Sequence, residues 1–310
     1  MTAIGVKTTT QQDSERLRER SSTTAILRVG LLGGFRVEVA GVAASAFAWQ
    51  RLSAKRLTKL LAATPSHAMH REQIFEILWP MASVDSARNS LAKALHAARH
   101  ALEPERLPRQ GSAYLYTRDD MIGLDTDHVL IDADEFQWLA QRALRLADAP
   151  AHETALAYEA ALALYRGALL PEDRYDDWPS ERRRYLADLN LRLLVGLAEI
   201  REIEGDRSGA IDCLEAALLE DQTREDAHRH LMHLYDATGA RDLALRQFET
   251  CRTHLRRELN RAPHWETIAL YEELLANRVP PRTTRRQPRV PRVEVATDRQ
   301  IAVEVGEGDR

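Results

Sequence analysis

A spacing of 34 residues recurs in the C-terminal half of the chain and restricts the fold more than any other feature. It separates four pairs of similar residues: Leu197 and Leu231, Gly205 and Gly239, Ala210 and Ala244, Leu214 and Phe248. This period is typical of stacked helical hairpins, in which a glycine ends the first helix and a small alanine lets the second helix approach closely. Such stacks bury a continuous core and present a concave surface, which more often binds a partner than catalyses a reaction.

Length and composition predict a soluble protein of two domains. The chain has 310 residues, of which 44% are hydrophobic and 29% charged. It has no apolar run near the length of a membrane span, and its N-terminus lacks the layout of a secretory signal, so we expect a cytoplasmic protein with no membrane contact. Cys213 and Cys251 are the only cysteines and lie far apart in sequence, which excludes a disulfide framework and a CxxC site.

Charge is segregated along the chain. Residues 26–118 hold 13 basic and 6 acidic side chains, a net charge of +7, whereas residues 119–279 hold 19 and 33, a net charge of -14. A basic domain followed by an acidic one indicates a nucleic-acid-binding module joined to a body that phosphates would repel. The alternative is that the helical repeats are acidic for solubility alone.

Residues 83–102 predict an amphipathic helix with one free face. Ser83 or Asp85 can cap its first turn. At 100° per residue, one narrow apolar stripe collects Leu91, Leu95, Ala98 and Leu102. The other side carries Asn89, Ala92, Lys93, His96 and His100, with Arg88 and Arg99 at its margin. We expect this free side to lack a carboxylate and to suit the major groove of duplex DNA, although a solvated polar face gives the same pattern.

The neighbouring patterns place this helix third in a compact unit. A hairpin over residues 26–39 turns at Gly33-Gly34, and helices follow over 49–63 and 70–79. After the third helix, Tyr114 and Tyr116 alternate with Leu115, so a second hairpin is expected to turn at residues 110–112. Sheet, three helices and hairpin is the order of a winged helix-turn-helix, whose third helix enters the major groove.

Several motifs of the chain resemble those of a known family. The motifs are Leu31-Leu-Gly-Gly-Phe35, Trp49 with Lys55-Arg56 and Leu60-Leu61, Arg71-Glu72 with Leu78-Trp79-Pro80, and Gly111 with Tyr114-Leu115. They look like the OmpR/PhoB-type winged helix that opens SARP-type transcriptional activators. Further motifs run from Asp134-Glu-Phe136 through Tyr165-Arg-Gly-Ala-Leu-Leu-Pro171 to Pro263. They resemble the bacterial transcriptional activator domain of that family, a tetratricopeptide-like unit.

The resemblance implies a mainly α fold. It predicts an N-terminal winged helix-turn-helix with small β hairpins over residues 25–128 and an all-α tetratricopeptide-like repeat domain over residues 129–278. Residues 1–24 are polar without an apolar period, and residues 279–310 are rich in Pro and Arg, so both are expected to be a disordered leader and tail.

The third helix is expected to supply the main DNA contacts. Asn89 and Lys93 are the best candidates to read bases, because amides pair with adenine and cationic groups with guanine. Arg88, His96 and Arg99 are expected to face bases or phosphates at the edge of the groove.

Two further groups are expected to position the DNA backbone. Lys55, Arg56 and Lys59 form a cationic side of the first helix, which a solvated surface would also explain. Arg109, with Ser112, is expected to make the contact of the second hairpin.

The resemblance further implies an activator that binds promoter-proximal repeats as side-by-side protomers, on the nucleoid, and contacts RNA polymerase through its sigma subunit. An alternative function is a protein-interaction adaptor that uses the winged helix and the repeats as a scaffold.

Other candidate sites are weak. His230 and His233 share a helical face but have no third ligand nearby, so no metal is expected. Asp173, Asp176 and Asp177 are interpreted as solvated loop carboxylates. Since no nucleophile or cofactor motif is present, we expect neither a cofactor nor an enzyme.

Overall fold

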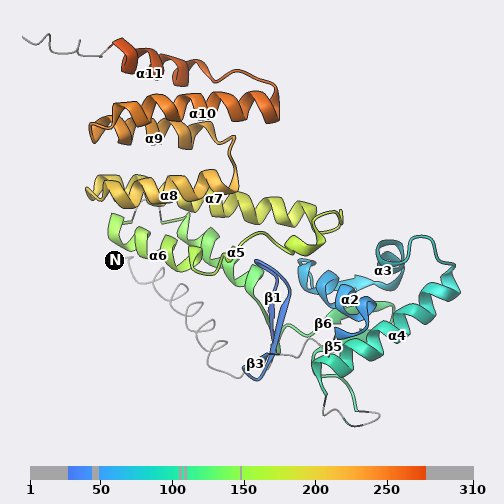
Figure 1. The fold of residues 1–310 in the computed structure, drawn as a ribbon. Helices are drawn as coiled ribbons and strands as arrows, with labels where there is room; N and C mark the ends of the chain where they lie inside the picture. Colours follow the sequence, from blue (N-terminus) through green and yellow to red (C-terminus); the bar gives the residue numbers. More distant parts are fainter. Residues whose placement is uncertain (1–26, 44–48, 105–106, 108–109, 147–148, 277–310) are drawn as a thin grey trace, which may run out of the picture.

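The computed structural model describes residues 27–43, 49–104, 107, 110–146 and 149–276. A stack of helices forms one part of the molecule, and a smaller unit of helices and strands lies at its side (Figure 1). The predicted leader and tail lie outside the described residues. Within them, no helix is long and apolar enough to cross a membrane.

The smaller unit contains two sheets around three helices. Its elements are β1 (Leu27–Gly30), β2 (Arg36–Val39), β3 (Val42–Ala43), α2 (Leu52–Ala63), β4 (Ala68–His70), α3 (Arg71–Leu78), α4 (Val84–Leu102), β5 (Leu115–Arg118), β6 (Met121–Leu124) and β7 (Val129–Ile131). One sheet has the strand order β3-β2-β1-β7 and the other β4-β6-β5. The first predicted hairpin is confirmed, as β1 pairs antiparallel with β2, and a hairpin of β5 and β6 follows α4 but turns at residues 119–120 rather than 110–112.

The sequence patterns missed three short strands. β3 extends the first sheet, β4 pairs with β6, and β7 pairs parallel with β1. Each has only two or three residues, too few to show an alternating pattern. β7 matters most for the architecture, because it joins the N-terminal sheet and then continues directly into the helical part at Asp132.

The helical part is a stack of antiparallel hairpins. Its elements are α5 (Asp132–Ala143), α6 (Ala151–Leu162), the short 3-10 turn η2 (Pro171–Asp173), α7 (Ser180–Ile203), α8 (Arg207–Glu220), α9 (Glu225–Ala237), α10 (Arg241–Leu259) and α11 (Trp265–Ala276). Gly205 and Gly239 follow α7 and α9 with φ of 86° and 79°, a backbone region that glycine adopts without strain. Ala210 and Ala244 are fully buried on the second helix of each hairpin. The 34-residue repeat and the predicted fold class are therefore confirmed.

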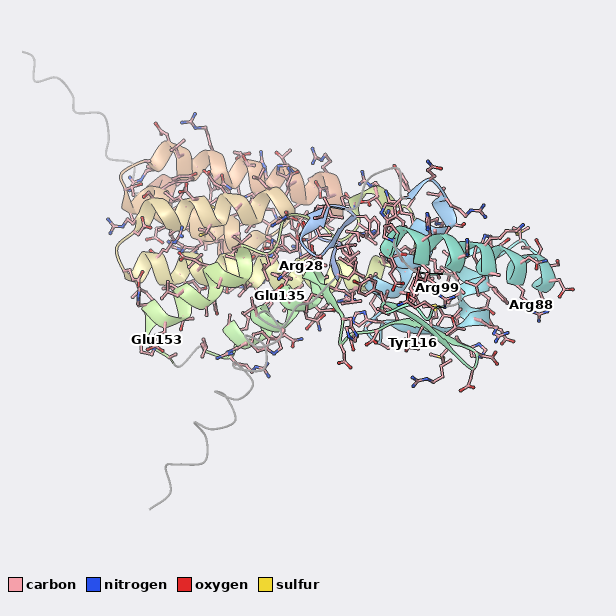
Figure 2. The ribbon with its side chains drawn as sticks, turned by 90° about the horizontal axis from the view of Figure 1, so that it is seen from below. Arg28, Arg88, Arg99, Tyr116, Glu135 and Glu153 are labelled. Carbon is pink, nitrogen blue, oxygen red and sulfur yellow. The ribbon has the colours of Figure 1, made fainter. Side chains whose placement is uncertain are left out.

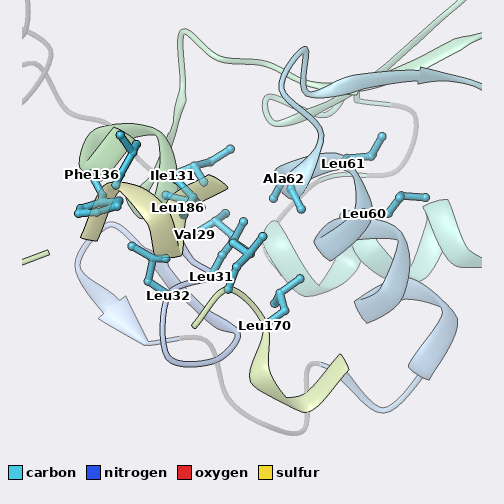
Figure 3. Packing of buried hydrophobic residues seen from close by; sticks show 14 of the residues in the cluster. Val29, Leu31, Leu32, Leu60, Leu61, Ala62, Ile131, Phe136, Leu170 and Leu186 are labelled. Carbon is cyan, nitrogen blue, oxygen red and sulfur yellow. The ribbon is translucent and has the colours of Figure 1, made fainter. Parts of the chain in front are cut away.

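One hydrophobic core joins the two parts. Leu31 and Leu60 from the smaller unit lie in the same buried cluster as Leu170 and Leu186 from the helical part, and each is at most 1% exposed. Figure 3 shows these side chains together with Phe136 of α5 and Ile131 of β7. The parts are thus packed against each other like layers of a single domain rather than joined by a linker.

Backbone and side-chain hydrogen bonds reinforce this interface. The Gly33 amide donates to the Ala168 carbonyl (3.0 Å), and the Leu170 amide donates to the Leu31 carbonyl (2.9 Å). Arg182 of α7 is buried and donates to the Ala63 carbonyl at the end of α2 (2.7 Å). These bonds fix the position of α2, and hence of α4 beside it, relative to the helical stack.

Candidate nucleic-acid interface

Helix α4 forms as the sequence predicts. The Ser83 hydroxyl accepts a hydrogen bond from the Ser86 amide (3.4 Å), and Arg99 and His100 lie in the last turn, where cations interact well with the helix dipole. The predicted stripe is buried, and Ala87, Ala94 and Ala101 extend it. Small residues on this side let α4 lie close to α2.

The opposite face of α4 is open to solvent. Asn89, Lys93 and His96 are exposed, and the Arg88 side chain is 59% exposed. Figure 2 shows Arg88 at the outer end of the helix, pointing away from the helical stack. None of these four side chains is covered by the repeats, so a duplex can approach the face without a hinge motion.

The expectation that this side lacks a carboxylate is wrong. Asp85, in the first turn, is 88% exposed, and its Oδ1 lies 3.1 Å from the Nη1 of Arg88. Of the two predicted capping residues, Ser83 and Asp85, it is Ser83 that caps the helix.

Arg99 is held by the neighbouring hairpin rather than pointing freely into solvent. Its Nη2 donates to the Thr117 hydroxyl (2.9 Å) and the Leu115 carbonyl (3.4 Å) of β5. Figure 2 shows Arg99 beside the hairpin that carries Tyr116. The guanidinium of Arg99 therefore joins α4 to the hairpin of β5 and β6, here called the wing, whereas a contact with the DNA groove was expected.

The wing also differs from the expectation in its turn. The two strands turn at Asp119 and Asp120, so its tip is acidic. Ser112 lies before the strands, where its hydroxyl donates to the carboxylate of Glu103 and accepts from the Leu115 amide (3.0 Å). Ser112 therefore ties the end of α4 to the base of the hairpin. Arg109 lies outside the described residues.

The cations of α2 face the helical part. Lys59 is 3% exposed, and its Nζ lies 2.8 Å from Glu172 and 2.6 Å from Asp173. The Arg56 guanidinium pairs with Asp176 at 3.2 Å. Carboxylates of the helical part thus pair with both cations, which the sequence patterns did not predict.

These ion pairs also change the interpretation of the acidic loop. Asp173 and Asp176 are partners of α2 rather than freely solvated carboxylates. Burial raises the pKa of Glu172, but hydrogen bonds from Lys59 and from the backbone, together with the charge of Lys59, outweigh it and hold the pKa below its ordinary value. The carboxylates of this loop therefore hold α2 against the helical part through ion pairs.

Lys55 shares one contact with Lys59, because the Nζ atoms of both lie 5.5 Å from the centre of the Phe35 ring, a cation–π contact. Lys55 differs in being only half-buried.

A further cationic position lies beside α4, at Arg51, which the sequence places on the same cationic side of the first helix as Lys55, Arg56 and Lys59. A hollow of about 900 Å³ lies between the first turn of α2 and the last turn of α4, with Arg51, Ser53 and His100 in its wall. Among the described residues, no side chain caps the start of α2, and its first turn contains no acidic residue. A helix start of this kind, with Arg51 beside it, suits an anion. In the sequence, this position is indicated by Arg51, which directly precedes α2.

Two histidines of α9 are engaged in structural contacts, and His233 is exposed. His228 is buried with Nε2 3.1 Å from the Gln222 carbonyl, and His230 pairs with Glu202. Within the described residues, no group of three His, Cys, Asp or Glu side chains could hold a metal ion.

Comparison with known proteins supports the assignment of the helical part. Residues 131–275 match the family model of the bacterial transcriptional activator domain. No curated protein sequence matches the chain.

Among solved structures, the chain is similar to EmbR of Mycobacterium tuberculosis, in a complex with a low-affinity phosphopeptide. The identity is 21% and the TM-score 0.65, over 81% of this chain and 65% of that one. The C-terminal tetratricopeptide-containing domain of an FK506-binding protein from Plasmodium falciparum is 14% identical over 47% of this chain and 89% of that one, with a TM-score of 0.35. The chain thus spans about two thirds of the length of EmbR, with the same fold.

Two observations on the molecule therefore agree. The stacked hairpins form a bacterial transcriptional activator domain, and they are packed on a winged helix whose third helix has an open face. Together with the likeness to EmbR, which shows the fold, they relate residues 131–275 to the bacterial transcriptional activator domain.

Proposed function

We propose that the chain binds double-stranded DNA sequence-specifically through α4 and regulates transcription as an activator. The open face of α4, with Asn89, Lys93 and His96 exposed, is the observation that carries the proposal. An amide and a cation on a helix of this kind match the edges of adenine and guanine in the major groove. The winged helix has a net positive charge, which favours the approach of a duplex.

The proposed phosphate contacts follow from accessibility. Arg51 and His100 border the hollow beside α4, so they replace Arg56 and Lys59 as candidates for the DNA backbone. The tip of the wing carries Asp119 and Asp120, of which Asp120 pairs with Arg71, so the backbone contact on that side would come from Arg118 of β5, which is exposed.

A salt titration tests the proposal. The full chain should bind duplex DNA. A plot of the logarithm of its affinity against the logarithm of the salt concentration should fall linearly. Lys93→Ala should weaken binding and lower the slope by about 1 if Lys93 neutralises one phosphate, or lower the preference between duplexes if it reads a base. Asn89→Ala should weaken only the preference.

Arg192→Ala is the matched control. Arg192 is exposed on α7, outside the winged helix, so its loss should leave both affinity and slope unchanged. Absence of duplex binding at physiological salt would instead favour the adaptor function, in which the open face of α4 contacts another protein.

We further propose that the helical repeats contact RNA polymerase, including its sigma subunit, and neighbouring protomers on tandem sites. Their net negative charge makes them unsuited to DNA and leaves their surface for proteins. Reconstituted transcription from a promoter that carries the selected binding site tests this: the full chain should raise the yield of transcript. A reduced yield, with DNA binding intact, would indicate a repressor.

A further inference from the structure

The first turn of α4 carries an exposed ion pair between Asp85 and Arg88. The Nη1 of Arg88 lies 3.1 Å from the Oδ1 of Asp85, and the two side chains are 59% and 88% exposed. An ion pair so open to water contributes little to stability. Ser83 already caps the helix. The fold therefore has little need of this pair.

Its position on the helix suggests another use. In helix-turn-helix proteins, residues near the N-terminus of the third helix approach the base edges. Arg88 lies one residue before Asn89, at the outer end of α4 (Figure 2). Asp85 lies one turn earlier, on the same side of the helix.

The negative charge of Asp85 would oppose DNA binding, so its presence on this face needs an explanation. A negative side chain on a surface that faces phosphates lowers affinity for every sequence alike. Asp85 can offset this loss by orienting Arg88, because it holds one nitrogen of a long side chain that is otherwise free to rotate. With Nη1 engaged, the Nη2 and Nε donors of Arg88 remain side by side, as the O6 and N7 acceptors of guanine require.

We propose that Asp85 is a positioning residue that directs Arg88 to a guanine and thereby sets part of the sequence preference of α4. This inference rests on the proposed DNA binding and names the base that is read at the start of the helix. Asp85 acts through Arg88 and touches no base in this role.

The test uses the full chain and duplexes selected from a random library by the wild-type protein. Each guanine of the selected site is replaced in turn by 7-deazaguanine, which lacks the N7 acceptor. One replacement should weaken wild-type binding about tenfold and have no effect on Arg88→Ala, which identifies the guanine that Arg88 reads. Asp85→Asn should reduce the effect of that replacement to about two- to threefold, while its affinity for random duplex DNA rises.

Asp119→Asn is the matched control. It removes one exposed negative charge from the same unit, on the hairpin of β5 and β6 rather than on α4, and Asn tolerates the positive φ of 53° at this position. It should raise affinity for selected and random duplexes equally. In the Arg88→Ala background, Asp85→Asn should leave the sequence preference unchanged.

The two proposals fail in different ways. If the wild-type chain selects no duplex, the proposed function is wrong. If it selects a site but the 7-deazaguanine effect is the same for wild type and Asp85→Asn, DNA binding stands and the positioning role is refuted. Unfolding curves of Asp85→Asn that coincide with those of the wild type exclude a loss of structure as the cause.

Discussion

Lys59 gives the sharpest test of how the two parts are held together. Lys59→Met keeps an unbranched apolar stem of similar size but removes the ammonium group that lies 2.6 Å from Asp173 and 2.8 Å from Glu172. Both carboxylates would then face the core without a cation. We expect the free energy of unfolding to fall, and the acidic loop to loosen.

The magnitude follows from burial. Removing one partner of a fully buried ion pair costs about 3–5 kcal/mol. Lys59 is 4% exposed in its side chain, Asp173 16% and Glu172 35%, so water partly compensates the carboxylates. We therefore expect a loss of about 2–3 kcal/mol. For a domain of this size, that corresponds to a Tm lower by about 4–10 °C.

Urea unfolding followed by circular dichroism measures the change. Lys55→Met is the matched control, because Lys55 is half-buried and makes only a cation–π contact, worth about 0.5–1 kcal/mol. Adding Glu172→Gln and Asp173→Asn to Lys59→Met should recover most of the loss, since no unpaired charge then remains.

The result also decides between the two interpretations of Lys59. If Lys59→Met were as stable as Lys55→Met but lost its affinity for DNA, Lys59 would be a phosphate contact, and the reasoning from its burial would be refuted.

Acid should weaken the ion pair between Lys59 and Glu172. The folded-state pKa of Glu172 is lowered, so its contribution to stability is fully present above its ordinary value of 4.5 and is lost as the pH falls through the lower folded value. In Lys59→Met this part of the acid dependence should disappear.

Three further predictions concern other contacts. Gly33→Ala should destabilise the interface by more than about 2 kcal/mol, because φ is 72° and an added Cβ would lie 2.5 Å from the Arg166 carbonyl oxygen; a melting temperature within 2 °C of wild type, against Gly41→Ala as control, would contradict this. Arg99→Ala should cost about 1–2 kcal/mol and speed hydrogen exchange in β5, since the bonds to Thr117 and Leu115 are lost; unchanged exchange would show that the wing does not depend on Arg99. Burial lowers the pKa of His228, so the unfolded chain takes up a proton that the folded chain does not as the pH falls below 6.5, and stability should fall there; His228→Gln should flatten that part of the stability curve, and an unaltered curve would argue against the buried neutral imidazole.

Periodicity predicted the fold well because it reports burial directly. The stripe on α4 and the glycines after α7 and α9 are consequences of local geometry, and each lies where the pattern placed it. The exposed face of α4 was likewise predicted, except for Asp85.

The partners of charged residues were not predictable in this way. Lys59 and Lys55 belong to the same cationic run and both contact Phe35, yet Lys59 is buried against Glu172, more than 100 positions away in sequence, and Lys55 is half-buried. A basic run gives no information on which carboxylates the tertiary fold brings to it. The acidic wing tip was missed for a related reason, because the turn residues at 110–112 and at 119–120 are equally suited to a hairpin and only strand pairing selects the second.

The passage of β7 into α5 has a geometric consequence for a promoter. Since no flexible tether separates the winged helix from the helical stack, a protomer seated on a duplex through α4 carries its repeats at a fixed angle around the DNA axis. Shifting its operator by about 5 base pairs, half a turn of B-DNA, would swing the repeats to the opposite side of the duplex, and a shift of a full turn would restore them. Transcription should therefore rise and fall with helical phase as the operator is moved.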